Sequence, residues 1–183
     1  MIRPKGLGRG LDADSTSIET ARVELLAGDC EAAERELRRD YEALDGLGER
    51  YFRSTVAALL AQALWCQNRL EEAGRFADVA EEISEPDDVL SQVTWRGARA
   101  KIMADGGAYD DAERTARAAV EMVSETAELS LQGDALIDLA EVIGRSGRGT
   151  EAKAVLEEAL ALYERKGDLT SAERARRLML IPR

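Results

Sequence analysis

Residues 107–112, Gly-Ala-Tyr-Asp-Asp-Ala, give the strongest indication of the fold, because the chain repeats this short pattern at nearly constant spacing. Three other hexads share its form, a turn residue and one or two acids followed by Ala: GDCEAA at 28–33, NRLEEA at 68–73 and GRGTEA at 147–152. The closing alanines, Ala33, Ala73, Ala112 and Ala152, stand 40, 39 and 40 residues apart. A period of this length predicts a stack of similar supersecondary units.

Helical patterns flank each hexad. Before the second one, apolar residues follow the i, i+3, i+4, i+7, i+8 spacing of an amphipathic helix: Val56, Leu59, Leu60, Ala63 and Leu64. Ala, Leu and Glu dominate the composition, whereas Val and Ile are scarce, which favours helices over strands. The patterns predict about nine helices, over residues 16–27, 30–44, 49–67, 70–84, 87–105, 109–124, 127–145, 150–165 and 169–180.

Several residues predict where these helices begin and end. Thr16 with Glu19, and Thr170 with Glu173, have the spacing of a capping box at the first and last helix starts. Pro86 separates two units and suits the first turn of the helix after it. Three glycines mark expected helix ends: Gly28, Gly107 and Gly147.

The expected fold is all-α. A single helix hairpin cannot bury its apolar face, but stacked hairpins can. We therefore predict a right-handed α-solenoid of about four antiparallel helix pairs and a C-terminal capping helix, forming one domain over residues 15–183. Residues 1–14 are predicted to be a disordered tail. The charged residues of the capping helix are expected to face water: Glu173, Arg174, Arg176 and Arg177.

Composition excludes several functions. The chain has no His, which removes Ser-His-Asp and Cys-His catalysis and His-ligated zinc. A formal net charge of −11 argues against nucleic acid or an anionic membrane as a partner, and no apolar run is long enough to span a bilayer. We expect a non-enzymatic, cytoplasmic protein without cofactor or metal, in which Cys30 and Cys66 are reduced, buried thiols.

The repeated turns resemble those of tetratricopeptide repeats. Small residues fall where that family brings its two helices together, at Ala61, Ala100 and Ala140, and an early Ala follows each turn, at Ala73, Ala112 and Ala152. The resemblance covers residues 21–178, although the period is about 40 residues instead of the family's 34. It implies a protein–protein interaction scaffold that holds a peptide or helix of another protein on its concave face.

Three stretches resemble a more particular group. "LLAGDCEAAERELRRDYEAL", "PDDVLSQVTWRGARAKIMA" and "ALALYERKGDLTSAERAR" are similar to the C-terminal helical repeat region of actinobacterial class III nucleotide cyclase/ATPase signalling proteins. This chain has no G-x-x-x-x-G-K-[ST] phosphate loop and no room for a cyclase domain. The resemblance therefore implies, as the alternative function, a bacterial regulatory or self-assembly module that lacks the catalytic domains.

Candidate partner-binding residues lie on the first helices of the pairs. They combine Trp and Arg, which dominate binding hot spots, with polar residues at the expected concave positions. The set is Gln62, Trp65, Gln92, Trp95, Arg96, Lys101, Asp134 and Arg145.

A structural interpretation of the same residues stays open. Arg96 and Arg99 can instead pair with carboxylates such as Asp134 or Asp138, while Trp95 fills a gap between pairs. The first helix carries apolar residues on more than one face, which favours a homodimer through that helix.

Overall fold

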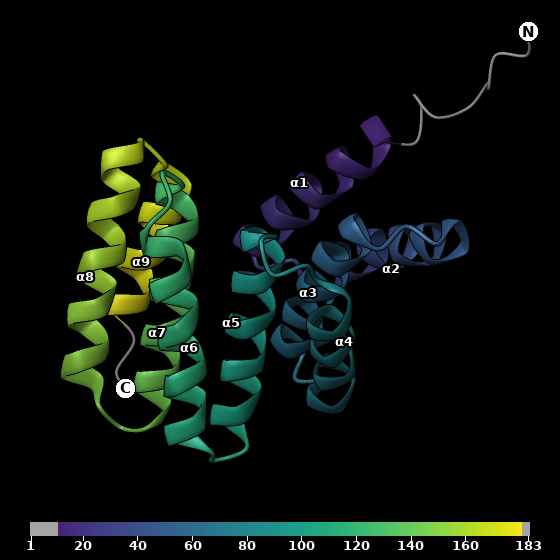
Figure 1. The fold of residues 1–183 in the computed structure, drawn as a ribbon. Coiled ribbons are helices and arrows are strands. Elements are labelled where there is room, and N and C mark those ends of the chain that lie inside the picture. Colours follow the sequence, from purple (N-terminus) through teal and green to yellow (C-terminus); the bar gives the residue numbers. More distant parts are fainter. Residues whose placement is uncertain (1–10, 181–183) are drawn as a thin grey trace, which may run out of the picture.

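The computed structural model of the chain describes the backbone of residues 11–180 and the side chains of residues 17–180. This part of the chain is all-helical and contains no strand (Figure 1). Its elements are α1 (Leu11–Ala27), α2 (Cys30–Leu47), α3 (Tyr51–Cys66), α4 (Leu70–Ile83), α5 (Val89–Asp105), α6 (Tyr109–Ser124), α7 (Leu129–Arg145), α8 (Gly149–Lys166) and α9 (Leu169–Met179). Every helix after the first begins within two residues of its predicted start.

The helices form a stack of consecutive pairs. Within each pair, turns of two or three residues join α1 to α2, α3 to α4, α5 to α6, and α7 to α8. The first helix of a pair also packs on the first helix of the next, so that α3, α5 and α7 form a continuous inner layer. Helix α9 packs on α8 and closes the C-terminal end (Figure 1). The predicted all-helical stack is therefore confirmed.

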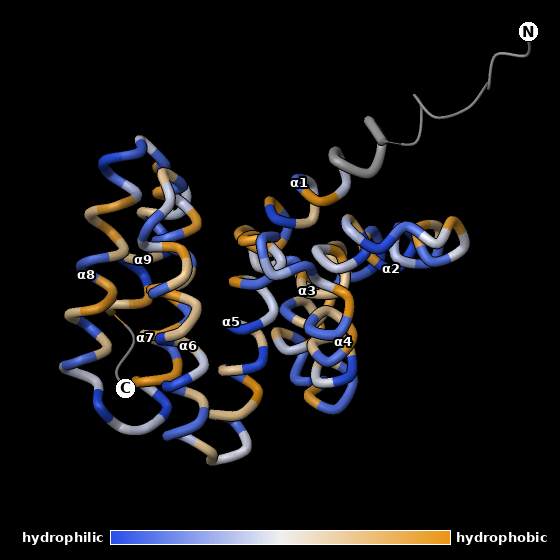
Figure 2. Tube along the Cα trace, in the orientation of Figure 1, coloured by the Kyte–Doolittle hydropathy of each residue, from blue (hydrophilic) through white to orange (hydrophobic). Residues whose placement is uncertain are grey.

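The inner and outer helices bury different amounts of surface. Helices α3 and α7 are buried along most of their length, whereas α2, α4, α6 and α8 each bury one stripe of mainly apolar residues. Figure 2 shows this alternation of hydrophobic and hydrophilic residues along α8. The six alanines at the predicted helix contacts are almost completely inaccessible, which lets the paired helices approach closely: Ala61, Ala73, Ala100, Ala112, Ala140 and Ala152. No helix in residues 11–180 is long and apolar enough to cross a membrane.

The turn residues behave as their sequence predicts. Gly28, Gly107 and Gly147 have φ angles of 84°, 82° and 83°, in the left-handed region that ends a helix at little cost for glycine. Asn68 takes the same position in the remaining hexad, with φ of 60°. One backbone geometry therefore serves all four turns.

Two predicted roles at helix starts are wrong, the Thr170 cap and the first-turn position of Pro86. The side chain of Asp168 caps α9 by accepting a hydrogen bond from the Ser171 amide at 3.0 Å, which leaves Thr170 inside the first turn. Asp88 caps α5 in the same way, 3.2 Å from the Ser91 amide, and Pro86 lies in the preceding turn. In both cases the N-cap residue is the Asp that directly precedes the helix.

The first helix also starts earlier than predicted. It begins at Leu11, so Thr16 is an interior residue and not a cap. Residues 11–14, which we assigned to a tail, belong to this helix. The rest of the predicted tail, residues 1–10, lies outside the described residues.

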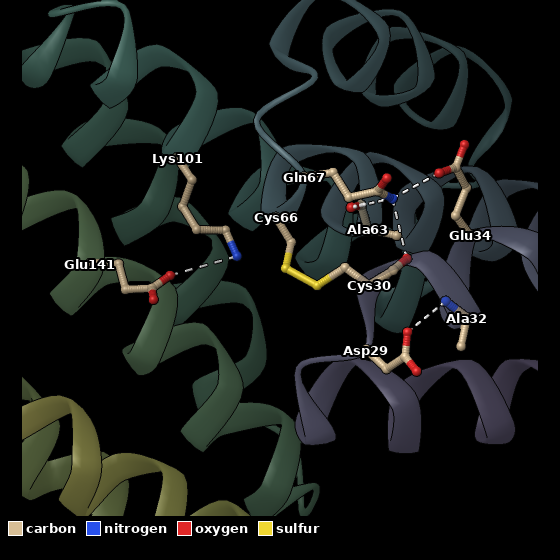
Figure 3. Close-up of a disulfide and its surroundings, with 9 residues drawn as sticks. All are labelled: Asp29, Cys30, Ala32, Glu34, Ala63, Cys66, Gln67, Lys101 and Glu141. Atoms are coloured by element: carbon tan, nitrogen blue, oxygen red, sulfur yellow. Dashed lines mark hydrogen bonds and ion pairs between the residues drawn. A yellow bond between two sulfur atoms is a disulfide. The ribbon is translucent and has the colours of Figure 1, made fainter.

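A disulfide joins Cys30 to Cys66, which corrects the prediction of reduced thiols (Figure 3). Cys30 begins α2 and Cys66 ends α3, so the stacking of these helices brings the two Cα atoms to 6.2 Å although the residues are 36 apart in sequence. Disulfides are typical of oxidising compartments. The bond therefore weighs against the cytoplasmic location that we expected, which stays a prediction.

An ion-pair network on the outer helices occurs twice. Each copy consists of two Arg and two Glu, which make four mutual ion pairs. They come from the second helices of two neighbouring pairs and from the turn that precedes the later of these helices. Every member has its counterpart 79 residues later: Glu34, Arg38, Arg69 and Glu72 correspond to Glu113, Arg117, Arg148 and Glu151. The duplicated unit is therefore two helix pairs long.

Candidate functional site

A cavity of about 310 Å³ lies on the inner side of the stack. Its walls come from α3, α5 and α7, the first helices of successive pairs, and from α1 and α9 at the two ends of the chain. This volume is at the lower limit of ordinary ligand pockets. The cavity is therefore the candidate binding site that the fold builds.

Helix α1 closes one side of the cavity. Its residues Ile18 and Ala21 are buried against α2 and α3, while Arg22 and Leu26 line the cavity. The Arg22 guanidinium lies 3.3 Å from an Asp134 carboxylate oxygen on α7, and α1 also contacts α9. Much of the second apolar face of α1, which suggested a dimer, therefore contributes to this intramolecular wall.

A buried ion pair forms part of the cavity wall. The Lys101 ammonium on α5 lies 2.7 Å from an Asp138 oxygen and 3.9 Å from a Glu141 oxygen, and Lys101 is only 3% exposed. Gly97 makes room for this pair, because a Cβ there would lie 1.9 Å from the second Asp138 oxygen. Burial raises the pKa of Asp138, and Lys101 opposes that rise.

Asp134 is held by partners on two other helices. The Tyr163 hydroxyl donates to one of its oxygens at 2.7 Å, and Arg22 lies near the other. The Tyr163 ring packs so closely over Gly133 that a Cβ there would lie 2.5 Å from a ring carbon. Burial and the neighbouring Asp134 raise the pKa of Tyr163, which stays a neutral donor.

Arg174 of α9 also lines the cavity, although we expected it to face water. It makes no hydrogen bond or ion pair with any residue in the part of the chain that the structure describes. Burial alone would lower its pKa, but the carboxylates of Glu141, Asp138 and Asp134 raise it. The guanidinium is therefore charged and has donors available to a ligand.

The lining combines fixed charges of both signs with apolar side chains. Such a surface can hold a polar ligand through ion pairs and hydrogen bonds. The lining or adjoining groups with a shifted pKa are Asp138, Tyr163 and Arg174. Asp138 and Tyr163 each have a protein partner, and Arg174 stays charged. The arrangement therefore favours binding over chemistry.

Three of the eight predicted site residues line this cavity: Gln62, Lys101 and Asp134. Trp65 and Arg145 lie together elsewhere, around Asp105. The Trp65 indole donates to Asp105 at 2.6 Å, and the Arg145 Nε donates to the other oxygen at 2.6 Å. Lys101 belongs to the cavity lining and also contacts the Trp65–Arg145 group, since its ammonium lies 4.5 Å from the Trp65 ring centroid.

The other three predicted residues form a packed group. Trp95 is 5% exposed among apolar residues of α3 and α4, and its indole N–H has no hydrogen-bond partner in the described structure. Gln92 donates to the backbone oxygen of Glu85 at 3.0 Å, and Arg96 donates to that of Gln92 at 2.9 Å. The arginine Arg96 also lies over the Trp95 ring.

The predicted pairing with carboxylates of an adjacent helix is confirmed for Arg99 but not for Arg96, and the two carboxylates named as examples are wrong. Arg99 pairs with Asp78 and Glu81 of α4, and Arg96 bonds to Gln92 of its own helix. The expected carboxylates Asp134 and Asp138 are occupied by other partners. Helix α5 therefore presents these arginines toward α4, away from α7.

Sequence reasoning missed Arg22 and Arg174 as site residues. Spacing offered a signal, because Arg174 follows Asp168 and Ser171 at intervals of three residues and therefore shares their helix face. Nothing in the sequence indicated that this face meets a cavity, since the opposite wall lies more than a hundred residues away.

Comparisons with known proteins agree on the fold. No family model and no curated protein matches the chain. A solved structure of a Signal Transduction ATPase with Numerous Domains (STAND) with a tetratricopeptide repeat sensor, from Pyrococcus horikoshii, is similar with a TM-score of 0.60 and 19% identity. The match covers 88% of this chain and 25% of that protein, so the chain spans a quarter of its length.

Two further solved structures are of a putative kinesin light chain with nearly identical TPR-like repeats, from Podosopora anserina. One gives a TM-score of 0.54 at 18% identity, covering 82% of this chain and 75% of that one. A point variant of the same protein gives 0.53 at 17% identity, covering 90% and 92%. Together with the paired helices, these likenesses define the class of fold: the chain has a tetratricopeptide-like helical repeat fold.

Proposed function

We propose that this protein is a non-enzymatic interaction module that holds a short, extended segment of a partner protein in its inner cavity. The observation that carries this proposal is the cavity itself, which the first helices of three pairs and α1 jointly enclose. Inner surfaces of helical repeat arrays commonly serve as binding surfaces. Gln62, Lys101 and Asp134 are the predicted residues that support this location.

The enclosure favours an extended segment over a helix. Helix α1 covers the side from which a helix would otherwise enter. An extended chain of a few residues needs less width and can reach the charged lining.

Filling the cavity tests this proposal. Gln62 lines the cavity without any hydrogen-bond partner in the described structure, so Gln62→Trp should occupy the cavity with little effect on folding. We expect peptides selected from a random heptapeptide display library on the wild-type protein to bind Gln62→Trp at least tenfold more weakly. Isothermal titration calorimetry measures the difference.

Glu71→Trp is the matched control, because Glu71 is exposed on the outer helix α4. It should bind the selected peptides as the wild type does. Equal binding by Gln62→Trp and wild type, with circular dichroism showing both folded, would place the partner site outside the cavity. A selection that enriches no peptide would also contradict the proposal.

A regulatory module of a signalling ATPase is the second candidate. The observation that favours it is the likeness to a STAND ATPase described as having a tetratricopeptide repeat sensor. In this case the chain would act on other domains or on itself, for example by pairing through α1, where Val23 is 63% exposed. Sedimentation velocity across a hundredfold concentration range tests self-association. A protein that stays monomeric at every concentration would contradict pairing through α1.

A further inference from the structure

We propose that the cavity recognises a zwitterion, a free α-amino acid or a short peptide, whose carboxylate binds Arg174 and whose ammonium binds Asp134. For a peptide, this inference rests on the proposed function, because it assigns the chemistry of the occupant of the same cavity. A free amino acid would go beyond it, as a ligand other than a partner segment. The inference also names Arg174, on the last helix, as an anchoring residue that the sequence did not indicate.

The carboxylate position follows from Arg174. A guanidinium offers five N–H donors, and this one has no acceptor among residues 17–180. Its charge is stabilised by Glu141, Asp138 and Asp134 at longer range, without a direct pair. A carboxylate accepts two parallel hydrogen bonds from such a group, which makes it a well-matched ligand.

The ammonium position follows from the surrounding charge. A bare anion at Arg174 would lie near Asp134 and Asp138 and would be repelled by them. A ligand that also carries a positive charge turns this repulsion into attraction. Both carboxylates already have protein partners. Asp138 is paired at 2.7 Å with the buried Lys101, whereas Asp134 accepts a hydrogen bond from the neutral Tyr163 hydroxyl at 2.7 Å and lies 3.3 Å from Arg22. Asp134 is the better partner of the two, because its only ion pair is the longer one.

Size and lining are consistent with this class of ligand. The cavity volume of about 310 Å³ accommodates a molecule of a few tens of atoms at most. Apolar residues from four helices line part of the wall and would contact a side chain: Leu26, Leu59, Val93 and Leu131. The charged groups therefore fix the main chain of the ligand, and the apolar wall selects its side chain.

The test titrates defined zwitterions into the purified full chain with its disulfide intact. The probes are the twenty L-amino acids and the Gly and Ala di- and tripeptides, each up to 10 mM, screened by thermal shift and measured by calorimetry. We expect at least one to bind. Its N-acetyl and C-terminal amide derivatives, which each lack one charge, should bind at least tenfold more weakly.

Two variants locate the site. Arg174→Met should weaken binding of that probe at least tenfold, whereas Arg176→Met should not. Arg176 is the matched control because it lies on the same helix and pairs with Glu164 on the outer side. Amino acids binding without peptides identify a free metabolite as the source, and the reverse identifies a chain segment.

Several outcomes overturn the inference: no probe binds at 10 mM, Arg174→Met binds as tightly as wild type, or the blocked derivatives bind equally well. These failures are distinct from failure of the proposed function. If library peptides are lost in Gln62→Trp but retained in Arg174→Met, the cavity binds a partner segment and the zwitterion assignment is wrong. If Gln62→Trp also retains them, the proposed function fails as well.

Discussion

Two glycines shape the cavity wall. Each lacks a Cβ, so a side chain from a different helix can lie directly against its backbone. Gly97 accommodates the Asp138 carboxylate, and Gly133 accommodates the Tyr163 ring. Both neighbours are pinned, Asp138 by Lys101 and Tyr163 by Asp134, so neither can move away at low cost. Glycine is therefore required at these helix positions despite its low helix propensity.

Gly133→Ala should destabilise the protein by about 1–3 kcal/mol, because the new Cβ would overlap a ring that is 1% exposed. Gly74→Ala is the control, since a Cβ there meets nothing within 4 Å, and it should stabilise by about 0.5–1 kcal/mol through helix propensity. Urea unfolding followed by circular dichroism measures both. Changes of the same sign in the two variants would contradict this account.

Between elements, the disulfide adds a covalent constraint to the packing of α2 on α3. Gln67 reinforces this junction, since its amide donates to the Cys30 backbone oxygen at 3.2 Å and to Glu34 at 2.7 Å (Figure 3). Figure 3 also shows Lys101 and Glu141 of the inner layer, whose charged groups face each other. The first two pairs are thus held by a bond that the later pairs lack in residues 11–180.

Cys66→Ser should lower the free energy of unfolding by about 4 kcal/mol. Without the bond, the unfolded chain regains the entropy that a closed loop of 36 residues takes from it. Urea denaturation measures this loss. Dithiothreitol should produce the same loss in the wild type and none in the variant. A wild type that keeps its full stability in the reductant would show that the bond contributes little.

Across the complete stack, the duplicated outer networks couple neighbouring repeats at both ends. Burial alone would raise the pKa of Glu34, but hydrogen bonds from Arg38, Gln67 and Arg69 hold it below its usual value of 4.5. Burial would also raise the pKa of Glu113, but hydrogen bonds from Arg148 and Arg117 lower it by more. A carboxylate with a lowered pKa in the fold contributes stability above its unfolded pKa and loses it as the pH falls through the folded pKa.

Glu34→Gln should therefore cost about 1–2 kcal/mol at pH 7, and the cost should shrink as the pH falls below about 4.5. Glu113→Gln should behave alike, because it holds the equivalent place in the second network. Glu71→Gln, at an exposed position, is the control and should have no such effect. Urea unfolding between pH 3 and pH 7 gives the profile, and a pH-independent cost would rule out this origin.

Much of the architecture could be predicted from sequence because its signals are local. Each hexad turn needs one residue with a positive φ angle, and each close helix contact needs an Ala. These residues therefore recur with the period of the repeat. Errors arose where two local signals competed, as when Asp168 caps α9 two residues ahead of Thr170. Of the predicted binding residues, Gln62, Lys101 and Asp134 line the cavity, whereas Trp65 and Arg145 bond to Asp105. Trp95 and Gln92 contact α4 and its C-terminal loop.

Local patterns in the amino-acid sequence are enough to specify the all-helical repeat, its period and its turns, since hydrogen bonding and side-chain periodicity act within a few residues. The curvature of the stack, by contrast, emerges only in three dimensions. It accumulates from packing between neighbouring pairs, and it brings α1 to α7 and α9 and places Arg174 in the cavity. The disulfide likewise depends on how α2 stacks on α3. Such contacts depend on the sum of many small rotations, which no single stretch of sequence encodes.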